Sequence, residues 1–274
     1  MTQIKEQSSQ TTGSALTEFN VLGVRVHAVQ IPTVIQQMRQ WIAERENCHY
    51  IAVTGMHGII EAQHDVGFKN VLNDADLVVP DGMPLVWIGR IRGQQLSRRV
   101  YGPELMATFC RETAAASCGY RHFLYGGDDG VAGQLARSLE KSCPGIQLAG
   151  SYSPPFRPLS EGEDSEIVAM INRAKPDVLW VGLSTPKQEK WMREHRERLQ
   201  VPVMVGVGAA FDFLSARKKQ APTWMQESGL EWLFRLVQEP ERLWKRYILG
   251  GAEFAFLVGL ELLGLRRFEP GSRR

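Results

Sequence analysis

The feature that most limits how this chain can fold is the alternation of two kinds of segment from Asn20 onward. Short runs rich in Val, Ile and Leu are separated by longer stretches in which apolar residues recur at the helical spacing i, i+3, i+4. Most of the short runs are too evenly apolar for a sheet with one solvated face. The pattern therefore predicts an α/β fold with a Rossmann-like, mostly parallel sheet and helices on both of its faces. The predicted strands are residues 21–29, 49–54, 75–80, 121–126, 145–152, 177–184 and 201–208.

The segments between these runs predict the helices and show where the organisation of the chain changes. After about Gln220 the alternation stops, and a helical stretch rich in Trp and Arg begins. We therefore expect a flexible tail (1–19), an α/β catalytic domain (20–219) and a helical C-terminal appendage (220–274). The helices predicted within the α/β domain are residues 33–45, 58–73, 103–117, 131–142, 163–174 and 187–199.

Composition narrows the class of protein. With 43% hydrophobic and 23% charged residues, the chain is typical of a folded globular protein, which excludes disordered, fibrous and multi-span membrane classes. A net charge of +2 does not indicate a nucleic-acid partner. The four Cys show no CxxC spacing, as expected of buried thiols in a reducing compartment. Because the polar N-terminal residues lack the apolar core of a signal peptide, we expect a cytoplasmic protein.

Polar residues and glycines follow five of the predicted strands at their carboxyl ends. In open α/β sheets, ligands bind outside this edge, so these segments are the candidates for chemistry. Asp81 lies in a Pro-Asp-Gly turn, which is often purely structural, but a carboxylate beside Thr54 and Gln188 also suits a general base. His57 opens a predicted helix, either as a ligand group or as a cap. The five segments are residues 54–58, 81–84, 127–130, 185–189 and 209–212.

A glycine-rich turn between a predicted strand and a predicted helix is a candidate phosphate site. Gly126 and Gly127 precede the helix at 131–142, whose backbone N–H groups would point toward a bound anion. Such turns are also compact connections with no ligand, and this alternative stays open. The Asp74–Asp76 segment resembles a metal-binding DxD motif. We discount it because it sits at the start of its predicted strand and so falls at the opposite edge of the sheet.

Several segments together resemble the WecG/TagA/CpsF family of bacterial glycosyltransferases. They are ADLVVPDGMPLVW, RRVYGPELM, DVLWVGLSTPKQEKWM, VGVGAAFDF and APTWMQESGLEWLFRLVQEPERLWKRY, and the resemblance runs from about Asn20 to Tyr247. It implies an inverting enzyme that moves a sugar, often N-acetylmannosamine, from a UDP-sugar to a polyprenyl-diphosphate-linked saccharide. The reaction would take place at the inner face of the cytoplasmic membrane, in the synthesis of exopolysaccharide, capsule or cell-wall polymer.

The resemblance also implies roles for individual residues. Asp81 would be the base, with Thr54 beside it. Substrate-binding positions would be Arg99, Gln188, Arg235, Arg242 and Arg246. Where many members carry Asn two residues after the Thr, this chain has Met56, so the sugar stays open and His57 is expected to take over part of the polar contact.

No cofactor is expected beyond the donor substrate, and no metal. Because the sequence has no DxD motif at the carboxyl edge of the sheet, the arginines are the better candidates for stabilising the leaving diphosphate.

The C-terminal segment has two open interpretations. Residues 247–265 are apolar except for Glu253 and Glu261, which fall on one side of a helix, and Lys and Arg flank the segment. A helix lying in the membrane interface fits this pattern, so a membrane surface is an expected partner. The alternative is a helix docked on the body of the protein or on another subunit; a homo-oligomer is left open.

Two other functions remain as alternatives to the glycosyltransferase. The first is a nucleotide-binding α/β oxidoreductase, against which the first strand–helix turn lacks GxGxxG. The second is a non-enzymatic nucleotide-binding membrane adaptor, which would have the same pocket without turnover.

Overall fold

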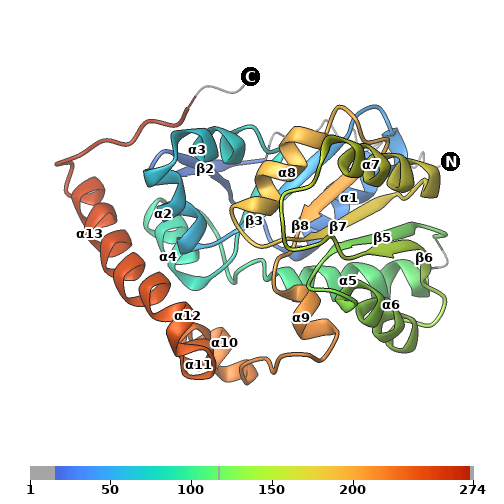
Figure 1. Ribbon diagram of the computed structural model, residues 1–274. Helices are drawn as coiled ribbons and strands as arrows, with labels where there is room; N and C mark the ends of the chain where they lie inside the picture. The colour runs from blue at the N-terminus through green and yellow to red at the C-terminus, as the bar shows by residue number, and fades with distance from the viewer. Residues whose placement is uncertain (1–15, 117, 272–274) are drawn as a thin grey trace, which may run out of the picture.

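A six-stranded parallel sheet forms the centre of the molecule (Figure 1). The computed structural model describes residues 16–116 and 118–271. Neighbouring strands pair in the order β4-β3-β8-β7-β5-β6, and every pair is parallel. This arrangement confirms the predicted α/β class. The strands are β3 (His49–Thr54), β4 (Leu77–Pro80), β5 (Arg121–Gly126), β6 (Gln147–Tyr152), β7 (Val178–Gly182) and β8 (Val203–Gly206).

Two buried apolar clusters lie against the sheet, one on each face. Successive side chains of a strand point to opposite faces, so Tyr50 and Ala52 of β3 enter one cluster while Ile51 and Val53 enter the other. Helices cover both clusters, as the evenly apolar strands predicted. The first is covered by α2 (Met56–His64), α3 (Val66–Asn73), α4 (Met83–Ile91), α7 (Glu161–Ala174) and α8 (Lys187–His195). The second is covered by α1 (Ile31–Glu44), α5 (Gly102–Ala115) and α6 (Val131–Ser142).

The predicted strand at 21–29 is wrong as a single strand of the main sheet. The chain instead forms an antiparallel hairpin of β1 (Glu18–Val21) and β2 (Val24–His27). Leu22 and Gly23 make the turn with φ of 50° and 83°, the positive values that two-residue hairpin turns require. β1 therefore starts inside the predicted tail 1–19; residues 1–15 of that tail lie outside the described residues.

The single helix predicted over 58–73 is also wrong, because two helices occupy this segment. α2 ends at His64 and α3 begins at Val66. Between them, the Asp65 carboxylate accepts a hydrogen bond from the Phe68 backbone N–H at 2.9 Å, which caps α3. Apolar periodicity continues across the break because both helices pack on the same face of the sheet.

The described chain after β8 is helical. A short helix, α9 (Ala210–Leu214), is followed by the predicted appendage, whose helices run along one side of the body (Figure 1). Its π-helical turn η1 (Lys245–Leu249) continues directly into α13 (Gly250–Leu262). The other elements are α10 (Thr223–Glu227), α11 (Glu231–Gln238) and α12 (Pro240–Trp244).

α13 docks on the body of the protein beside α2. Its Phe254 and Leu257 are buried in the same cluster as the α2 side chains. Glu253 lies 3.0 Å from His64, and Glu261 lies 2.7 Å from Arg92. Both carboxylates of the apolar segment therefore pair with side chains of the body; Glu261 is 9% exposed, whereas Glu253 remains 35% exposed. No helix in the described part of the chain is both long and apolar enough to cross a bilayer.

Candidate active site

A cavity of about 1360 Å³ opens at the carboxyl edge of the sheet, between the loops after the strands and the appendage. Thr54 and Gly126, two of the ten predicted site residues, are not among its lining residues; they are buried behind Gly55 and Gly127, which are. The other eight line the cavity, although they come from six separate stretches of sequence: His57, Asp81, Arg99, Gly127, Gln188, Arg235, Arg242 and Arg246.

Asp81 lies where β4 ends, with its backbone N–H bonded to the Thr54 carbonyl at 2.8 Å. The next residue, Gly82, has φ of 110°, which turns the chain sharply into α4. Oδ1 of Asp81 is buried without a hydrogen-bond partner among the described residues. Burial raises the pKa of Asp81 to about 6. A carboxylate with these properties is suited to take a proton near neutral pH.

Thr54 is the last residue of β3, and His57 lies in the first turn of α2. The Thr54 hydroxyl is buried, and the described residues offer its oxygen no partner. Burial and the nearby Arg246 guanidinium lower the pKa of His57 to about 3. His57 is therefore a neutral imidazole at pH 7, able to hydrogen-bond a ligand but not to supply charge. Met56, at the position where the resemblance led us to expect Asn, lines the same cavity close to Gly251 of α13.

Gln188 is held in one orientation by two hydrogen bonds. Its side-chain oxygen accepts from the Gly208 N–H at 3.0 Å, and its NH2 group donates to Glu189 at 2.9 Å. The Thr185 hydroxyl donates to the same Glu189 oxygen at 2.8 Å. Glu189 is fully buried, and burial raises its pKa. The sequence did not single out Glu189 as a site residue, because the only sign of such a role was its position next to Gln188.

Three arginines of the appendage form the cationic side of the cavity. Arg235 comes from α11, Arg242 from α12 and Arg246 from η1. Arg246 is the most notable, because its Nε atom is buried with no partner in the described part of the chain. Burial lowers its pKa, as does Arg235. Buried guanidinium groups that lack a full set of carboxylates are suited to bind an anion.

Arg99, from the α/β domain, also lines the cavity and has a close carboxylate partner. Its guanidinium lies 2.5 Å from Glu231 of α11 and stacks 4.0 Å from the ring centre of Tyr101. Sequence reasoning missed Glu231 and Tyr101. Glu231 lies in the C-terminal segment in which only the arginines were predicted to bind substrate, and the neighbouring sequence gave no sign that the Glu231 side chain would be buried.

The glycines of the turn after β5 are required by the backbone itself, without any ligand. Gly126 has φ of 136°, and a β-carbon there would lie 2.5 Å from the Gly182 carbonyl oxygen. The first N–H groups of α6 also have partners, since Val131 donates to Asp128 at 3.0 Å and Ala132 donates to Ser153 at 3.1 Å. Phosphate binding by Gly126 and Gly127 stays a prediction.

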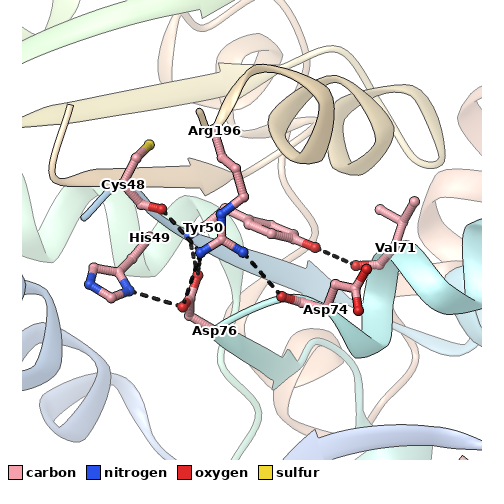
Figure 2. Close-up of polar contacts among 7 residues, drawn as sticks. All are labelled: Cys48, His49, Tyr50, Val71, Asp74, Asp76 and Arg196. Atoms are coloured by element: carbon pink, nitrogen blue, oxygen red, sulfur yellow. Dashed lines mark hydrogen bonds and ion pairs between the residues drawn. The ribbon is translucent and has the colours of Figure 1, made fainter. Parts of the chain in front are cut away.

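The Asp74–Asp76 segment lies at the amino-terminal edge of the sheet, before β4, and none of its residues lines the cavity. Figure 2 shows its contacts with His49 and Arg196. Asp76 accepts from the His49 ring at 2.9 Å and from Arg196 at 3.2 Å, and Asp74 lies 2.6 Å from Arg193. These carboxylates therefore hold α8 and β3 together. Among residues 16–116 and 118–271, no group of three or more His, Cys, Asp or Glu side chains is placed to hold a metal ion.

The far end of the cavity is lined by flat aromatic side chains that the sequence did not single out. The Trp191 ring of α8 stacks on the His195 ring at 4.2 Å between centres, and the Tyr125 ring lies tilted against it at 4.5 Å. Phe156 is 94% exposed, with the Lys187 ammonium 4.6 Å from its ring centre. Such surfaces suit a planar ring or the face of a sugar.

At the carboxyl edge of this α/β sheet, a carboxyl group whose pKa is raised toward neutral pH lines the same cavity as a cluster of arginines. These features are those of an enzyme site for a substrate with an anionic group. Comparison with known proteins assigns the family. The model of the glycosyl transferase WecG/TagA/CpsF family matches residues 19–268, so the chain belongs to that family. This confirms the expectation of a glycosyltransferase and disfavours the oxidoreductase alternative.

Named relatives agree with this assignment. An N-acetylglucosaminyldiphosphoundecaprenol N-acetyl-beta-D-mannosaminyltransferase of Bacillus subtilis (strain 168) is 32% identical over 75% of this chain and 77% of its own length. Enzymes of the same name from Bacillus spizizenii and Staphylococcus aureus (strain MW2) are 30% and 26% identical. The alignments cover 69% and 84% of this chain, and 70% and 86% of those enzymes.

Proposed function

We propose that this enzyme transfers an N-acetylmannosamine-like sugar from a UDP-sugar to a GlcNAc-diphosphate-polyprenol acceptor, with inversion at the sugar carbon. The observation that carries the proposal is Asp81, which lines the cavity where three arginines gather and whose buried Oδ1 has no hydrogen-bond partner among the described residues. The names of the relatives supply the sugar and the acceptor.

The chemistry follows from these two groups. Asp81 takes the proton of the acceptor hydroxyl while that oxygen forms a bond to C1 of the donor sugar. The bond from C1 to the diphosphate breaks on the opposite side, and its electron pair stays on the departing UDP. Arg235, Arg242 and Arg246 stabilise the charge that develops there. His57 and the Gln188 amide lie in reach of the sugars as neutral hydrogen-bonding groups.

The arginines make a divalent metal unnecessary in this proposal, since they supply the positive charge for the leaving group. Transfer activity should therefore persist in excess EDTA. Loss of activity with EDTA and its return with Mg²⁺ or Mn²⁺ would contradict this part of the proposal.

We further propose that the enzyme acts at the inner face of the cytoplasmic membrane, where a lipid-linked acceptor resides. α13 buries Phe254 and Leu257 against the body, whereas large apolar side chains of η1, of α13 and of the turn after it are exposed. Lys245, Arg266 and Arg267 lie near them in the sequence. An exposed apolar strip flanked by cations is typical of an interfacial helix. We call these side chains the C-terminal apolar surface: Ile248, Leu249, Phe256, Leu262, Leu263 and Leu265.

The test is a transfer assay with a panel of UDP-sugars and a GlcNAc-diphosphate-lipid acceptor, read by mass spectrometry of the lipid product. We expect the acceptor to gain the mass of one N-acetylhexosamine. Transfer of another sugar would correct the donor, and binding of UDP without turnover on any acceptor would favour the adaptor alternative.

A further inference from the structure

Glu231 connects the appendage to the site through both of its carboxylate oxygens. Oε2 lies 2.5 Å from Nη2 of Arg99, and Oε1 accepts from the Tyr101 hydroxyl at 3.1 Å. Oε1 also lies 3.9 Å from Arg235, one turn further along α11. The side chains of Glu231 and Arg99 are only 8% and 13% exposed. This is a buried charge cluster, where interactions are stronger than at the surface.

The Arg99 guanidinium also lies close enough to Asp81 to lower the pKa of that carboxyl group. Yet Oδ1 of Asp81 has no hydrogen-bond partner in the described part of the chain, whereas Arg99 bonds Glu231. The site therefore holds two carboxylates. Arg99 bonds Glu231, while Oδ1 of Asp81 has no partner among residues 16–116 and 118–271.

This division matters for a proton acceptor. A guanidinium that paired directly with Asp81 would occupy the lone pair that must receive the proton, and would weaken the carboxylate as a base. A second carboxylate that satisfies the arginine removes that competition.

We propose that Glu231 is a positioning residue that holds Arg99 off the free oxygen of Asp81 and so keeps Asp81 available to accept the proton. The inference rests on the proposed function, in which Asp81 is the base. It gives the appendage a second task, because Glu231 comes from α11 while Asp81 and Arg99 come from the α/β domain. The base is then complete only when α11 is docked.

The charges around Asp81 predict the sign of each effect on its pKa. Glu231 raises the pKa, whereas Arg99 lowers it, as do Arg235 of α11 and Arg246 of η1. His57, on α2, is neutral near pH 7, and the Tyr101 hydroxyl is protonated there because burial raises its pKa. Glu231→Gln should therefore lower the pKa of Asp81, Arg99→Gln should raise it, and the double variant should nearly restore it.

The experiment measures kcat/KM against pH for the full-length enzyme with the UDP-sugar and lipid acceptor identified by the transfer assay. We expect the acidic limb of the profile to move to lower pH by about 1 unit in Glu231→Gln. The plateau value of kcat/KM in Glu231→Gln should fall about tenfold, because Asp81 becomes a weaker base. In the Glu231→Gln, Arg99→Gln double variant the limb should return toward the wild-type position. Glu241→Gln, on the exposed side of α12, is the control and should leave the profile unchanged.

Two further measurements keep the outcomes distinct. If Asp81→Asn retains wild-type turnover, the base assignment is wrong and this inference falls with it. If Asp81→Asn is inactive but the limb stays in place in Glu231→Gln, only the role of Glu231 is overturned. The role of Glu231 is also overturned if the acidic limb is displaced as far in the double variant as in Glu231→Gln. Where a variant is too slow for kinetics, ¹³C-NMR titration of the Asp81 carboxyl, assigned by its absence in Asp81→Asn, measures the same shift.

Discussion

The hydroxyl oxygen of Thr54 and the backbone of Gly58 approach so closely that a β-carbon at residue 58 would overlap that oxygen. This contact seats the first turn of α2 on the end of β3. It thereby fixes Met56 and His57 at the cavity and leaves the buried Thr54 hydroxyl beside the start of the Asp81 turn.

Gly58→Ala should therefore lower turnover without unfolding the protein. The added methyl group must displace either Thr54 or the start of α2, and a shift of about 1 Å at a site can cost up to about 10²-fold in rate. Gly162→Ala is the matched control, since it also lies in a helix but its β-carbon would meet no atom within 4 Å. Wild-type kcat in Gly58→Ala, with a normal melting temperature, would show that this contact does not position the site.

Asp81→Asn should lower kcat by roughly 10²- to 10⁴-fold while leaving the affinity for the UDP-sugar nearly unchanged, because it removes only the proton acceptor. Asp129→Asn, an exposed substitution after the glycine turn, is the control. Steady-state kinetics and calorimetric titration of UDP separate the two effects.

The same substitution should stabilise the fold above pH 6. The pKa of Asp81 is raised, so the folded state binds this proton more tightly than the unfolded state, and the charged form costs stability as pH rises from about 4 through about 6. Asp81→Asn should thus raise the free energy of unfolding at pH 7.5 by about 1–3 kcal/mol. The gain should disappear near pH 4. Chemical denaturation at pH 7.5 and pH 4 measures the free energy of unfolding. An equal gain in stability at both pH values would show that the ionisation of Asp81 is not its cause.

Arg246→Ala should have the largest effect among the appendage arginines, with kcat lower by about 10²- to 10³-fold. Its Nε atom is buried and finds no partner in the part of the chain that the structure describes, whereas Arg242 is 58% exposed and bonds Glu239 at 2.6 Å. Arg111→Ala, at an exposed arginine of α5 that does not line the cavity, is the control. If Arg246→Ala retains full transfer activity, the leaving group is stabilised elsewhere.

Replacing Leu263 and Leu265 together by Glu should reduce binding to anionic vesicles while leaving the fold intact. Both side chains belong to the C-terminal apolar surface and are 74% and 72% exposed. Val66→Glu, 69% exposed on α3, is the matched control and should bind vesicles like the wild type. Co-sedimentation with phosphatidylglycerol vesicles measures both. Unchanged binding of the double variant would point to a different membrane contact or to none.

The local pattern of the sequence was sufficient for most of the sheet. Residues 49–54 and 121–126 are strands with the predicted bounds, because apolar runs of this length have few other ways to be buried. The segment 21–29 was misjudged for the same reason: both hairpin strands are apolar on their buried sides, and only Leu22 and Gly23 at positive φ reveal the turn.

The sequence by itself determined which residues lie at the carboxyl edge of the sheet, because that follows from strand position alone. Asp81, Gln188 and Gly127 reach one cavity for this reason. Only the tertiary structure decided the charge pairing, since Glu231 and Arg99 are 132 residues apart and meet through the docking of α11. It also decided that Glu253 and Glu261 pair with side chains of the body, and so which side of α13 remains exposed. Helical period fixes which residues share a face, but long-range packing chooses what that face contacts.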